Sequence, residues 1–149
     1  MGRGRWSVAT DEFDALERLG RADSALVLRA LAATLPFLSV PRQDLQTVRS
    51  AVERWDPLRV DEGAAVGALL AMRPHLRLYV LGLLSSRLRE PEAALRYAGD
   101  LEALPGPSSA RALVGDLART IRADVAWQGR RLREALEHSS RSVERCRSS

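Results

Sequence analysis

The chain has 149 residues, of which 46% are hydrophobic and 28% are charged, a balance typical of a soluble folded protein rather than a disordered one. The net charge of +4 is modest and favours acidic partners only weakly. A single cysteine excludes an intrachain disulfide, and the two histidines lie far apart in the sequence, so we expect no metal and no cofactor.

All 23 basic residues are arginine, and lysine does not occur. One explanation is the codon usage of a GC-rich genome. The other is a demand for bidentate recognition of phosphate or carboxylate, which the guanidinium group suits better than an ammonium group. Both explanations stay open at the level of sequence.

No export signal or membrane segment is recognisable. The N-terminus carries arginine without an apolar run behind it. The two most apolar stretches, 24–40 and 76–88, are short and are interrupted by arginine. We therefore expect a cytoplasmic protein.

Apolar residues recur at steps of three and four along most of the chain, and Ala, Leu, Arg and Glu are good helix formers. No stretch alternates with period two for long enough to be a strand. Residues 1–9 and 141–149 are expected to be tails, and 10–140 to form one helical domain. The expected helices are 11–19, 22–35, 42–55, 61–72, 75–88, 91–104, 110–128 and 131–140.

In the first half, Thr10 or Asp11 is expected to cap the first helix, and Gly20 suits the left-handed position that ends it. Pro36 ends the second helix. The third has a clear amphipathic stripe that ends at Trp55.

The helix expected at 75–88 is apolar nearly all round, so it should be the most buried element. Arg73–Pro74 is expected to separate it from the helix before it. Gly82 lies in its middle, where glycine costs about 1 kcal/mol of helix stability relative to alanine. This residue makes sense if another helix crosses closely at that point.

Three places in the chain share a pattern in which a small residue and an apolar face lead into a short polar turn, and the next helix opens with Ala-Leu. The interval between the first two Ala-Leu pairs is close to two units of about 34 residues. The pattern resembles the tetratricopeptide repeat. It is carried by Leu19–Gly20 with Ala25–Leu26, Leu81–Gly82 with Ala94–Leu95, Ala126–Trp127 with Ala135–Leu136, and by Pro105.

This resemblance implies an all-α fold, a right-handed α-solenoid of about four antiparallel helical hairpins, with a closed helical bundle as the alternative. Trp127 is expected to fill a gap between stacked hairpins. The C-terminal units also resemble helical repeat regions of bacterial signalling and regulatory proteins, so the chain could be a piece of such a protein. The structural repeat positions are Gly20, Ala25, Gly82, Ala94, Trp127 and Ala135.

Catalytic patterns are missing: the sequence has no glycine-rich phosphate loop, no nucleophile motif and no evident pair of carboxylates. We therefore expect a protein that is not an enzyme and that takes no small-molecule substrate. The favoured function is a scaffold that binds a peptide or partner domain on its concave face.

Four arginines on the helices expected to line that groove are candidates for binding carboxylates: Arg49, Arg77, Arg119 and Arg122. The alternative is a basic helical protein that binds nucleic acid or has a regulatory role, since arginines cluster in 130–147. Aromatic residues do not accompany that cluster, so the protein-binding function is preferred over nucleic-acid binding.

Overall fold

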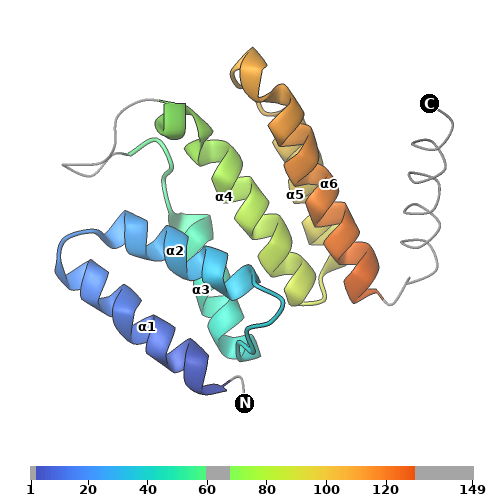
Figure 1. The fold of residues 1–149 in the computed structure, drawn as a ribbon. Helices are drawn as coiled ribbons and strands as arrows, with labels where there is room; N and C mark the ends of the chain where they lie inside the picture. The colour runs from blue at the N-terminus through green and yellow to red at the C-terminus, as the bar shows by residue number, and fades with distance from the viewer. Residues whose placement is uncertain (1–2, 60–67, 130–149) are drawn as a thin grey trace, which may run out of the picture.

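The computed structural model describes residues 3–59 and 68–129, and these residues form six α-helices. The expected all-α class is confirmed for this part of the chain. Two expected helices lie wholly or mostly outside the described residues: 131–140, which contains Ala135, and 61–72. The helices, labelled as in Figure 1, are α1 Arg3–Arg18, α2 Ala22–Thr34, α3 Arg42–Arg54, α4 Ala68–Arg87, α5 Pro91–Ala103 and α6 Arg111–Gln128, with a 3₁₀ turn Ser108–Ala110 before α6.

Each helix packs against the next in the sequence, and α4 also contacts α2 and α6. Figure 1 shows α4 between α2 on one side and α6 on the other. Packing between sequence neighbours is what a stack of hairpins and a helical bundle would both produce.

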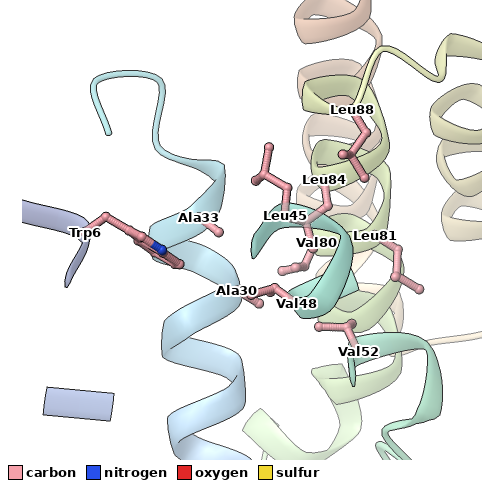
Figure 2. Packing of buried hydrophobic residues seen from close by; sticks show 10 residues of the cluster. All are labelled: Trp6, Ala30, Ala33, Leu45, Val48, Val52, Val80, Leu81, Leu84 and Leu88. Carbon is pink, nitrogen blue, oxygen red and sulfur yellow. The ribbon is translucent and has the colours of Figure 1, made fainter. Parts of the chain in front are cut away.

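Two hydrophobic clusters meet at α4, which supplies side chains to both of them. The first cluster joins α1, α2, α3 and α4, and Figure 2 shows its buried members around Leu84. The second joins α4, α5 and α6 around Leu101 and Ile121. Every residue from Val80 to Ser86 is buried, which confirms that the apolar segment 75–88 is the most buried part of the described chain.

The crossing expected at Gly82 is present. A Cβ atom built on Gly82 would lie 2.5 Å from Cδ1 of Ile121 and 3.0 Å from its Cγ1. Because any side chain here would press into α6, the glycine allows the two helix backbones to approach.

The first helix begins at Arg3 rather than at Thr10 or Asp11, so the predicted start was wrong. Thr10 does not cap a helix; its hydroxyl donates to the carbonyl of Ser7 at 2.7 Å, within the helix. Trp6 is buried, and its indole N–H donates to the Asp44 carboxylate on α3 at 2.9 Å. This contact ties the segment expected to be a tail to the folded domain.

The predicted boundary at Arg73–Pro74 was also wrong, because α4 continues through Pro74. Arg73 is held before the proline by an ion pair with Asp23 at 2.6 Å, and its guanidinium lies 5.1 Å from the centre of the Trp55 ring. His75 is buried directly after it. Tertiary contacts on both sides thus outweigh the local preference of the residue before a proline for extended backbone.

Two turns use left-handed backbone. Gly20 has φ of 76°, which confirms the prediction that it ends the first helix. Arg89, after α4, has φ of 65° without being glycine. Its N–H bonds to the carbonyl of Ser86, and the N–H of Glu90 bonds to that of Ser85, both at 3.0 Å. This is the Schellman arrangement, in which glycine usually occupies the position of Arg89.

None of the helices in the described ranges combines the length and the apolar character needed to cross a membrane.

Candidate functional site

The four arginines predicted to bind carboxylates lie in two separate places. Arg49 on α3 and Arg77 on α4 both contact Glu53. Arg119 and Arg122 lie on α6, next to acidic residues of α6 and α5.

The first place is a polar network that joins α3, α4 and α5. Arg49 donates to the carboxylate of Glu90, and its Nε lies 3.6 Å from Glu53. Arg77 donates to the backbone carbonyl of Glu53 at 2.7 Å. The Tyr97 hydroxyl lies 3.5 Å from the Glu53 carboxylate, to which it donates. Both arginines are therefore bonded within the chain, although Nε of Arg49 has no hydrogen bond to the described residues.

At the second place, Arg122 donates to both oxygens of the Glu102 carboxylate, at 2.8 and 2.7 Å. These hydrogen bonds lower the pKa of Glu102 and raise the pKa of Arg122. Arg119 forms an ion pair with Asp116, one turn away, and its side chain is 73% exposed. Of the four arginines, Arg119 is the most accessible to a partner.

Several arginines, including Arg77 of the four candidates, bind the carbonyl groups at helix C-termini, a role that sequence reasoning did not foresee. The last carbonyls of a helix have no partner within the helix, so a donor from elsewhere stabilises them. The pairs are Arg87 with Ala33, Leu35 and Leu38 beside the end of α2, Arg77 with Val52 and Glu53 at the end of α3, Arg42 with Leu88 after α4, and Arg89 with Gln128 at the end of α6.

Arg87 also belongs to a cluster of ionisable groups between α4 and α6. Burial lowers the pKa of Arg87, and the charge of Asp124 opposes that effect. Burial and the Asp124 charge both raise the pKa of Tyr79. One carboxylate oxygen of Asp124, Oδ2, is buried without a hydrogen-bond partner. Perturbed groups of this kind are candidates for a functional site.

The protein's two tyrosines are expected to ionise above the usual pKa of about 10. For Tyr79 the causes are burial and Asp124; for Tyr97 they are burial and then mainly Glu53. Removing the charge with Asp124→Asn should lower the pKa of Tyr79 and leave that of Tyr97 in place. Tyrosinate absorbance after rapid pH jumps measures both values, and Tyr79→Phe assigns them. Two tyrosines that titrate at the ordinary value in the folded protein would contradict this prediction.

One side of α6, at the edge of its contact with α4, carries large apolar side chains. Residues 113, 117, 124 and 127 follow one another at steps of four, seven and three, so they lie along one side of the helix. Leu113 is 51% exposed and Trp127 is 63% exposed. Trp127 does not fill a gap between the described helices, contrary to expectation, because its side chain is largely exposed and points away from the inward face of Ile121. We call Leu113, Leu117, Asp124 and Trp127 the α6 stripe.

Among the described residues, His75 joins no group of metal-binding side chains. It is buried against the backbone of Gly106, where an added Cβ would lie 2.7 Å from the imidazole ring, and neither ring nitrogen has a hydrogen-bond partner. Within residues 3–59 and 68–129, no three metal-binding side chains gather at one place.

Comparison of the chain with protein-family models, curated proteins and solved structures finds no match.

Proposed function

We propose that this protein is a non-catalytic interaction module, a right-handed solenoid of tetratricopeptide-like hairpins that binds a peptide or a helix of a partner protein. The order of packing supports the architecture: α2, α4 and α6 contact one another in turn, as alternate helices of a hairpin stack do. In Figure 1 these three helices lie side by side.

The observation that carries the binding function is the α6 stripe. Leu113 and Trp127 are large apolar side chains that remain exposed near opposite ends of α6. Exposed tryptophan is typical of the few residues that provide most of the energy of a protein interface. Arg49, Arg77 and Arg122 are already bonded within the chain, so the α6 stripe is a better docking surface than the arginines.

Asp124 indicates the chemistry of the partner. Its Oδ2 atom has no hydrogen-bond donor, although leaving a buried carboxylate oxygen without one is unfavourable. Asp124 as a whole is only partly buried, so a basic side chain of the partner would pair with its carboxylate from the accessible side. The partner segment is therefore an amphipathic helix with a basic residue among apolar residues at steps of three and four, which would pack along α6.

A display selection of random peptides on the purified protein tests this proposal. We expect the enriched peptides to carry a basic residue flanked by apolar residues at helical spacing. Their binding should be lost in the double variant Leu113→Ala/Trp127→Ala and weakened in Asp124→Asn. The matched control is Leu19→Ala/Phe37→Ala, which removes two even more exposed apolar side chains outside α6 and should bind normally.

Peptides that bind the α6 double variant as well as the parent protein would refute the proposed surface. A selection that enriches no peptide, together with strongly salt-dependent binding to random duplex DNA, would favour nucleic-acid binding instead.

A further inference from the structure

An open cavity of about 230 Å³ lies between the α4–α5 turn and the last turn of α6. Val125 lines it and is two residues from Trp127, so the two side chains point to nearly opposite sides of α6. The cavity is therefore separate from the α6 stripe. Its described lining residues, none of them acidic, are Ser86, Arg89, Pro91, Val125, Gln128 and Gly129.

Arg89 supplies a positive charge at this cavity. One of its guanidinium nitrogens donates to the carbonyl of Gln128, and the remaining N–H groups have no hydrogen bond to the described residues. Its left-handed backbone is one that glycine would adopt more readily. Such backbone positions in residues other than glycine concentrate at ligand sites.

Ser86 supplies a free hydroxyl group. The residue is only 2% exposed, yet its Oγ has no hydrogen-bond partner. Serine in a helix commonly satisfies its hydroxyl with the carbonyl one turn earlier, and Ser86 does not. A buried hydroxyl without a partner is unfavourable unless something else binds it.

The N-terminus of α5 borders the same cavity through Pro91, its first residue. No side chain caps this 13-residue helix. The positive end of the helix dipole favours a negative group there. Arg89, Ser86 and the α5 N-terminus thus all suit an anion, while Pro91 and Val125 offer apolar surface.

We infer that this cavity binds a carboxylate carried on a short apolar group. The carboxylate would accept hydrogen bonds from Arg89 and from Ser86 Oγ, and the apolar group would pack on Pro91 and Val125. A dry cavity of about 150 Å³ holds benzene, so the volume here accommodates a branched acid of a few carbon atoms. This site goes beyond the proposed docking function, because it requires no partner protein. The C-terminal residue of a peptide presents the same chemistry as a free acid.

Titrations followed by amide chemical shifts test the inference, with isovalerate, N-acetyl-leucine and the neutral amide isovaleramide as probes at constant ionic strength. We expect both acids to shift the amide signals of Arg89, Gln128 and Gly129 with saturation at millimolar concentrations, and isovaleramide to shift none. Tighter binding of N-acetyl-leucine would identify a peptide C-terminus as the source, and tighter binding of isovalerate a free acid.

Arg89→Gly removes the guanidinium while giving the turn its preferred residue, so the fold should persist. Acid binding should weaken about tenfold or more, the usual effect of losing a charge-assisted hydrogen bond. Ser86→Ala should weaken binding a few-fold without loss of stability. Arg96→Ala, on the same helix as Pro91 but outside the cavity lining, is the matched control and should bind normally. Equal binding of acid and amide, no saturable shift, or undiminished binding by folded Arg89→Gly would each overturn the inference.

Discussion

Replacing Arg87 with alanine is expected to lower the free energy of unfolding by about 3 kcal/mol, a magnitude drawn from charged hydrogen bonds in general. The guanidinium donates to the carbonyls of Ala33, Leu35 and Leu38 at 2.6, 2.8 and 2.9 Å, and alanine leaves all three without that donor. Chemical denaturation in urea measures the loss.

Arg87→Lys should recover only part of this loss, because one ammonium group does not reproduce the planar spread of guanidinium donors. Arg119→Ala is the control: its side chain is 73% exposed, so its effect should stay within about 0.5 kcal/mol. Equal stabilities of Arg87→Ala and Arg119→Ala would show that the carbonyl bonds contribute nothing to folding.

Gly82→Val is expected to lower the free energy of unfolding by about 3 kcal/mol, because its carbon atoms would press into a well-packed core. The first of these atoms, Cβ, would already lie 2.5 Å from Cδ1 of Ile121, which is itself fully buried. Ile121→Ala should be similarly damaging, at about 3 kcal/mol, because it opens a cavity.

Combined, the two substitutions should be much less damaging than their sum, since valine at position 82 occupies space that Ile121 vacates. The expected coupling is about 2 kcal/mol in the favourable direction. Thermal and urea unfolding of both single variants and the double variant measure it. Additive losses would mean that the crossing of α4 and α6 is looser than the structure shows.

Much of α4 could be predicted from the sequence, because a helix that is buried on all sides consists almost entirely of apolar residues. The burial of segment 75–88 and the helix crossing at Gly82 could be predicted for that reason. The continuation through Pro74 was not, because it depends on Arg73, whose ion-pair partner Asp23 is 50 residues away. The rule that a residue before proline avoids helical backbone considers only neighbours in the sequence, so it does not include such a partner.

The candidate site was less predictable for the same physical reason. Whether an arginine is free depends on carboxylates and carbonyls from other helices. Arg49 is 41 residues from Glu90, and Arg122 is 20 residues from Glu102. Helical periodicity predicts the helix face on which these side chains lie, but it does not predict which residues of other helices contact that face. Trp127 illustrates the same limit, since its residue type favoured burial while its position on the helix determined exposure.

The arginines that bind helix C-termini give the fold a particular response to acidity. A guanidinium group remains charged at every physiological pH, whereas carboxylate pairs such as Arg122–Glu102 weaken as acid neutralises the carboxylate. Arg77 and Arg87 fix the ends of two neighbouring helices from α4 itself. Acid below the usual glutamate pKa of about 4.5 should therefore loosen the Arg122–Glu102 pair between α5 and α6, while the ends of α2 and α3 stay anchored to α4.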